Sequence, residues 1–134
     1  MAANALDSYY QKALDLVDKL MTNQADANTL LFTANVCNQL SQHARVEKAL
    51  ALLVKLSPDN PEAWFDLAGV QAINNRAPEA LASLRTSLQL SAKRRVQNSN
   101  AANLYDNAGT DPRFTPLRQK PDFERLMAEL KPSK

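Results

Sequence analysis

The stretch that decides the fold runs from Pro61 to Ala92 and reads PEAWFDLAGVQAINNRAPEALASLRTSLQLSA. It predicts two helices, one over 61–73 and one from Pro78 toward Ala92, because proline fits the first turn of a helix. Asn60 is placed to cap the first helix, since its side chain can accept hydrogen bonds from the first free backbone amides. The residues at 74–76, Asn-Asn-Arg, supply a short turn, because asparagine tolerates the left-handed backbone that ends helices.

The same alternation of helix and short turn continues on both sides of this stretch. Further helices are predicted over 6–21, 27–40, 45–56 and 98–107, and a last one begins near Pro121. The first of these is amphipathic, and its predicted apolar stripe consists of Leu6, Tyr10, Ala13, Val17 and Leu20. No segment favours a strand. The predicted fold class is therefore all-α, a short solenoid of antiparallel helix pairs that stack because one pair cannot bury its apolar face alone.

The composition agrees with one helical domain over 1–134. Alanine and leucine supply much of the 45% hydrophobic content, and only two glycines occur. The net charge of +2 comes from interspersed acids and bases, which is typical of a solvated surface and does not indicate a nucleic-acid footprint. No apolar run approaches the ~20 residues that span a bilayer, so no membrane insertion is expected. The start, MAANALDSYY, lacks the basic and apolar regions of a signal peptide.

Within 61–92 the residue types match a known repeat. Trp64 is followed by Leu67 and the small residue Ala68, and Ala80 comes sixteen residues after Trp64, with Ser87 at a second small position. This pattern resembles the tetratricopeptide repeat (TPR), a 34-residue helix pair whose small residues allow its helices to cross closely. The resemblance implies that Trp64 anchors the core between the paired helices. The departures from the motif are Gln71 for tyrosine, Leu84 for the aromatic residue and Ala92 for the closing proline.

The resemblance extends more loosely over the rest of the chain. The clearest repeat covers 61–94, and 27–60 resembles a degenerate repeat. The alignment of the second helix of 27–60 with the motif is left open. The segment 6–21 resembles the second helix of an earlier repeat. The segment 95–134 resembles a decayed repeat, with Ala102 at the small position, followed by a C-terminal cap like those that close TPR arrays in larger bacterial proteins. Four apolar residues are expected to form this cap: Phe114, Leu117, Phe123 and Leu126.

No constellation of residues predicts catalysis, a metal or a cofactor. The single histidine, His43, is expected at the surface in a turn, and the single cysteine, Cys37, is expected in the core. One Cys and one His cannot form a zinc site, and no glycine-rich phosphate loop is present. One cysteine fits a cytoplasmic or a periplasmic location. The basic run at 93–95 is interpreted as a solvated helix end, with nucleic-acid or anionic-lipid binding as the alternative.

The resemblance implies that the first helix of each pair lines a concave, peptide-binding surface. Asparagine amides can both donate to and accept from a peptide backbone, while apolar residues supply the floor of such a groove. The most favoured function is therefore a module that binds a protein or peptide segment, without enzymatic activity. The alternatives are a structural spacer that self-associates through its terminal helices, or an accessory domain of a larger enzyme. The candidate peptide-binding residues are Leu31, Asn35, Asn38, Phe65, Ile73 and Asn103.

Overall fold

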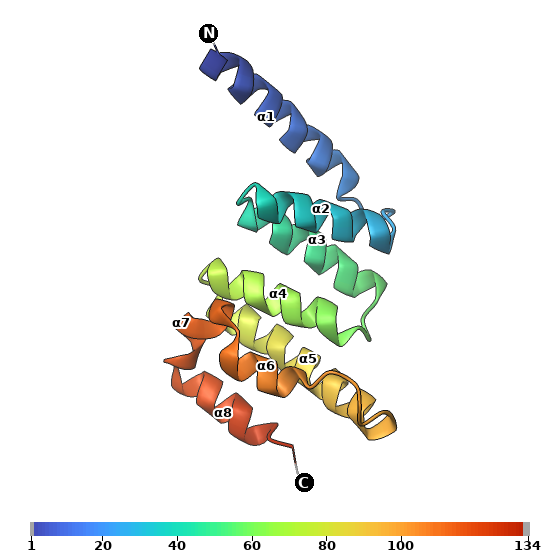
Figure 1. Ribbon diagram of the computed structural model, residues 1–134, viewed down its shortest axis with the longest axis vertical. Helices are drawn as coiled ribbons and strands as arrows, with labels where there is room; N and C mark the ends of the chain where they lie inside the picture. The colour runs from blue at the N-terminus through green and yellow to red at the C-terminus, as the bar shows by residue number, and fades with distance from the viewer. Residues whose placement is uncertain (1, 133–134) are drawn as a thin grey trace. The chain divides into compact units, whose positions relative to one another are not determined.

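The computed structural model describes the backbone of residues 2–132 and the side chains of residues 7–132. Over the described residues the chain is 78% helical without a strand, and neighbouring helices pack in pairs (Figure 1). This confirms the predicted all-α fold class. The chain forms two compact units, Met1–Leu56 and Ser57–Lys134, and each is described by itself. The prediction of one domain over 1–134 stays a prediction, and the side chain of Leu6 lies outside the described residues.

The first unit contains α1 (Ala2–Leu20), α2 (Ala27–Gln39) and α3 (His43–Leu56). Asp26 caps α2, because its carboxylate accepts a hydrogen bond of 2.8 Å from the Thr29 backbone N–H. The expectation that His43 lies in a turn is wrong, since α3 begins at this residue. The turn ends earlier because Ser41 adopts the left-handed backbone, with φ of 57°.

The α2–α3 pair forms the core of the first unit. Leu30 and Cys37 from α2 and Leu53 from α3 are almost fully buried, which confirms Cys37 as a core residue. Burial raises the pKa of its thiol. The helix α1 adds the buried residues Leu14 and Val17, and Met21, directly after α1, is buried as well.

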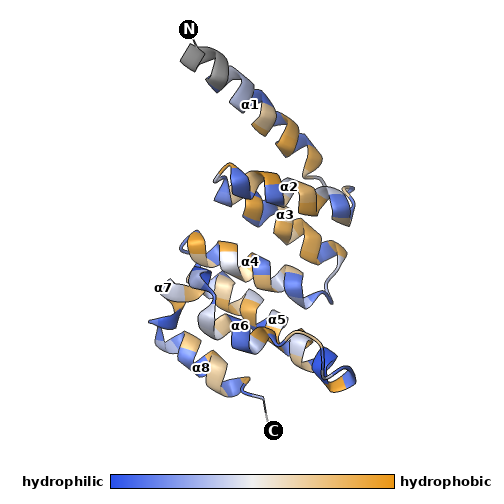
Figure 2. Ribbon diagram, in the orientation of Figure 1, coloured by the Kyte–Doolittle hydropathy of each residue, from blue (hydrophilic) through white to orange (hydrophobic). Residues whose placement is uncertain are grey.

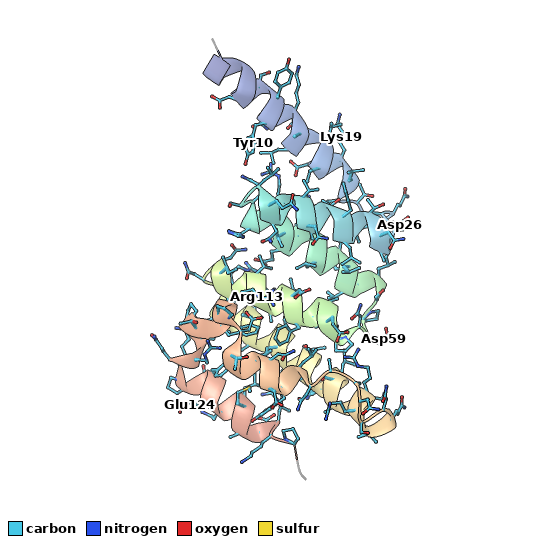
Figure 3. All side chains as sticks on the ribbon, viewed as in Figure 1. Tyr10, Lys19, Asp26, Asp59, Arg113 and Glu124 are labelled. Atoms are coloured by element: carbon cyan, nitrogen blue, oxygen red, sulfur yellow. The ribbon has the colours of Figure 1, made fainter. Side chains whose placement is uncertain are left out.

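The buried face of α1 differs from the predicted stripe, because Ala13 and Leu20 are exposed. Polar contacts accompany this rotation of the helix. The Tyr10 hydroxyl, which points from α1 toward α2 in Figure 3, donates to the Leu40 carbonyl at 3.4 Å. Arg45 of α3 binds both carboxylate oxygens of Asp18 at 2.8 and 3.1 Å. The helical spacing of apolar residues in one segment does not identify partners in other helices.

The second unit begins with α4 (Pro61–Ile73) and α5 (Ala77–Gln97). As predicted, Asn60 caps α4, and its side chain accepts from the backbone N–H groups of Glu62 and Ala63 at 3.0 and 3.3 Å. After α5 come α6 (Leu104–Thr110), the 3₁₀ turn η1 (Pro112–Phe114), α7 (Thr115–Arg118) and α8 (Pro121–Glu129).

The helix predicted over 98–107 begins later, at Leu104. The preceding residues are not helical, because the Asn98 side chain accepts from the Asn100 N–H at 3.1 Å in a turn. The Ser91 hydroxyl then donates to the Ala102 carbonyl and accepts from the Leu104 N–H, both at 3.3 Å. Ala102 itself is exposed, so its expected role as a small residue at a helix crossing is wrong. The hydrophilic end of α5 and the turn after it are visible in Figure 2.

The close crossing of α4 and α5 is confirmed. Ala68, Ala80 and Ser87 are fully buried, and the Ser87 hydroxyl donates to the Pro61 carbonyl at 2.8 Å. The departure at Gln71 has a physical reason, since its buried amide oxygen accepts a hydrogen bond of 2.7 Å from Ser83. A buried polar group needs such a partner. The pair is therefore held by small apolar residues together with two serine hydroxyls.

Trp64 does not anchor this core, which corrects the expectation drawn from the TPR motif. Its side chain is partly exposed, and its indole N–H donates to the Pro58 carbonyl at 2.8 Å. An indole N–H seeks an acceptor when it leaves water, and the turn before α4 provides one. The neighbouring Phe65 is buried in the core of the second unit instead. Trp64 thus fastens the turn that leads into α4.

The C-terminal segment closes the core of the second unit as predicted. Phe114, Leu117, Phe123 and Leu126 are all buried in one cluster with residues of α4 and α5. The Tyr105 hydroxyl of α6 donates to the Met127 carbonyl at 2.7 Å. Arg85 of α5 forms an ion pair with Glu129 at the end of α8.

We expect Ala80→Leu to lower the free energy of unfolding by about 1–3 kcal/mol, because added methylenes overpack a tight crossing. Ala82→Leu is the matched control, since Ala82 lies on the same helix and is exposed. Urea unfolding of the two variants measures the difference. Equal stabilities would show that the crossing has room for a larger side chain.

The ion pair of Asp18 and Arg45 predicts a pH dependence. The hydrogen bond from Arg45 lowers the pKa of Asp18 below its ordinary value of 3.8. Its stabilising effect is therefore present above pH 3.8 and is lost as the pH falls through the lower, folded-state pKa. Because both side chains are partly exposed, Asp18→Asn is expected to cost less than about 1 kcal/mol at pH 7. Thermal unfolding should show that this cost vanishes in strong acid, and an unchanged cost there would contradict the assignment.

Candidate functional site

Three of the predicted site residues lie together on α2 of the first unit. Leu31, Asn35 and Asn38 recur at helical spacing, so they share one face of the helix, and all three are exposed. The side chain of Leu31 is 44% exposed, and that of the adjacent Phe32 is 64% exposed. Within the described part of the chain, the side-chain amides of the two asparagines bind no other residue. We call these four residues the α2 surface.

Phe32 was missed because the motif does not assign its position to the groove. The available signal was its place on the polar side of an amphipathic helix, one residue after Leu31. An exposed phenylalanine beside free amides provides both apolar area and directional hydrogen bonds. Protein interfaces combine these features, with aromatic residues enriched over the rest of the surface.

Phe65, the residue expected to form the floor of the groove, is not open to a ligand. Its side chain is 6% exposed, and the ring of Phe114 meets it edge to face with centroids 5.2 Å apart. The Arg113 guanidinium carbon lies 5.6 Å from the centre of the same ring. The chain's own η1 segment therefore covers this face of α4, and the expectation of an open apolar floor is corrected.

Arg113, labelled in Figure 3, contacts two carboxylates, those of Asp66 and Asp111. Its guanidinium contacts Asp66 at 3.3 Å and Asp111 at 2.9 Å. Partial burial raises the pKa of Asp66, although Arg113 acts in the opposite direction. Burial also acts to raise the pKa of Asp111, but the hydrogen bonds and charge of Arg113 outweigh it and leave this pKa below its ordinary value.

Gly69 makes room for this arrangement. A Cβ atom at Gly69 would lie 2.7 Å from the guanidinium of Arg113, which is too close for two non-bonded heavy atoms. The absence of a side chain at this position therefore permits Arg113 to lie directly on the helix. The cluster of Arg113, Asp66 and Asp111 therefore links the η1 segment to α4 within the second unit.

The remaining candidates lie apart from one another in the second unit. Ile73, at the end of α4, is partly exposed at 40%. Asn103 precedes α6, and its amide donates to Asp106 at 3.0 Å. Asn103 also borders a pocket of about 330 Å³. Of the six candidate residues, the three on α2 thus lie together within the first unit.

No metal-binding cluster is found in the described residues. They contain no group of three or more His, Cys, Asp or Glu side chains that could hold a metal ion. None of the described helices is both long and apolar enough to cross a membrane. The absence of enzymatic activity and of a cofactor stays a prediction.

Comparison with known proteins gives one informative similarity. No family model matches the chain, and no solved structure matches it. The chain is 32% identical over 102 residues to human protein O-mannosyl-transferase TMTC1, a match that covers 71% of this chain and 11% of the relative. The chain therefore spans 11% of the length of that protein. The relative contains tetratricopeptide repeats, which agrees with a helical-repeat chain, and its human source gives no support for a bacterial parent protein.

The two glycines of the chain provide a matched test of the Arg113 cluster. Gly109 lies in α6 with open space around the position of a Cβ. Gly109→Ala should therefore raise the free energy of unfolding by about 0.5–1 kcal/mol through helix propensity. Gly69→Ala should not, because it displaces Arg113 from its carboxylates.

Urea unfolding of both variants measures this difference, and Arg113→Ala supplies the control background. In that background Gly69→Ala should become stabilising, because the clash is gone. If Gly69→Ala stabilises the unmodified chain as much as Gly109→Ala does, Arg113 is not held in place.

Proposed function

We propose that the chain is a TPR-like module that binds a segment of another protein on the α2 surface. The observation that carries this proposal is the combination of two unengaged asparagine amides with the exposed Leu31 and Phe32. Neither apolar side chain is among the buried residues of the first unit. A bound segment would provide partners for all four.

The spacing of the asparagines suits a peptide backbone. Asn35 and Asn38 are three residues apart, which places them about 4.5 Å from each other along the helix axis. Residues of an extended chain advance about 3.3 Å each, so both amides can reach neighbouring peptide groups. Each amide both donates and accepts, and can therefore pair with a backbone N–H and C=O.

The expected magnitudes assign different roles to the two kinds of residue. A hydrogen bond contributes a net of about 0.5–1.5 kcal/mol. A large apolar side chain contributes about 1.5–3 kcal/mol when it is fully buried. Leu31 and Phe32 therefore provide most of the affinity, while Asn35 and Asn38 determine the register and direction of the bound segment.

The basic run at the end of α5 gives less support to nucleic-acid binding. Arg94 is engaged with Glu62 at 2.9 Å, and Arg95 donates to the Ala101 carbonyl. Two of the three cations in this run thus have partners within the second unit. A protein partner is the better candidate.

Two alternatives each draw on one observation. Self-association draws on the exposed Tyr9, Leu16 and Leu20 of α1, and a light-scattering mass of one chain would exclude it. An accessory role in a larger enzyme draws on the relative, which is named as a transferase and of which this chain matches 11%. Transferase activity restored by adding this chain to a truncated enzyme would favour that role.

The test uses the full chain immobilised to capture partners, followed by titration of the captured protein. The variant Phe32→Ser with Asn35→Ala and Asn38→Ala should weaken binding at least about tenfold, or ~1.4 kcal/mol. Its fold should persist, because all three positions are exposed. Asn23→Ala with Gln24→Ala, two exposed polar positions in the turn after α1, is the control. Equal binding by the two variants would reject the α2 surface.

A further inference from the structure

The second unit contains a pocket that is not part of the α2 surface. It has a volume of about 330 Å³ and is lined by residues of α5, by the start of α6 and by the chain that follows α8. This volume is at the small end of the range for ligand pockets, about 300–1,000 Å³. It can hold one or two residues of a peptide. All of its lining residues belong to the second unit.

The walls of the pocket are mainly apolar. Leu88 is buried at its base, while Leu130 contributes from the end of α8. Val96 is 87% exposed, the highest value among the exposed large hydrophobic residues. The Tyr105 hydroxyl is engaged with the Met127 carbonyl, so this residue offers its ring to the pocket. An aliphatic side chain in the pocket would therefore meet apolar atoms on several sides.

The charge at the pocket has one sign. Arg95 is the single charged residue among those that line it. One nitrogen of its guanidinium donates to the Ala101 carbonyl, and the group has further donors for a carboxylate. Lys131 stands between two lining residues, Leu130 and Pro132, and is exposed. The surroundings thus favour an anion beside an apolar group.

We propose that this pocket binds an acidic segment of a partner protein, with a leucine-sized side chain against Val96 and Leu88 and a neighbouring carboxylate on Arg95. The Arg95 guanidinium matches the planar geometry of a carboxylate. Asn103 also lines the pocket, and while its amide nitrogen donates to Asp106, its amide oxygen can accept a backbone N–H of the segment. This site is separate from the α2 surface and does not depend on it.

The experiment titrates the isotope-labelled full chain with a blocked peptide, acetyl-Gly-Ser-Leu-Glu-Asp-Gly-amide. The peptide concentration is raised to about 1 mM, so that a complex with a Kd of about 1 mM or less is detected. We expect the NMR signals of Val96, Asn103 and Tyr105 to shift. Two further peptides, one with glycine for leucine and one with lysine for both acids, should bind at least about tenfold more weakly. The absence of shifts with the acidic peptide would overturn the proposal.

Two variants with equal charge test the position of the bound segment. Val96→Glu adds a charge and removes the apolar wall, while Gln97→Glu adds the same charge at an exposed residue outside the lining. Val96→Glu should weaken binding about tenfold and Gln97→Glu by less than about threefold. Equal losses, or equal binding of the glycine peptide, would show a general attraction to the basic run and reject the pocket. Amide spectra check that both variants keep the fold.

Discussion

The second unit depends on the close approach of α4 and α5. Ala68, Ala80 and Ser87 are small enough for the helices to approach closely where they cross, and the Ser87 hydroxyl donates from α5 to the Pro61 carbonyl at the start of α4. This approach sets the rotation of α4 about its axis. Phe65 then faces the core of the unit, where the C-terminal segment packs on it, and Trp64 faces the turn before α4.

The helices themselves could be predicted because their boundaries depend on local chemistry. Asn60 and Pro61 start α4 through capping and a fixed backbone angle, and the asparagines after Ile73 end it. These effects need no distant partner. The small residues of the crossing could also be predicted, since the spacing from Trp64 to Ala80 belongs to a repeat pattern. Such local agreement explains why the fold class is confirmed.

The facing of individual side chains was harder to predict because it depends on residues far along the chain. Phe65 is covered by Phe114, and α1 makes hydrogen bonds to Leu40, directly after α2, and to Arg45 of α3. Neither partner can be identified from the helical periodicity of one segment. Helical spacing does predict that Asn35 and Asn38 share one face of α2, and both are exposed, while their role in binding stays a prediction. The repeat pattern does not identify Phe32, because it assigns no groove position to this residue.

The single cysteine provides an intrinsic probe of the first unit. Cys37 is fully buried between α2 and α3, and this burial raises the pKa of its thiol. Alkylating reagents and oxidants attack the thiolate, so the folded chain is protected from both. The rate at which a thiol reagent modifies Cys37 therefore measures how often the α2–α3 pair opens. Because the chain has no other thiol, the signal reports on that unit alone, even while the second unit stays folded.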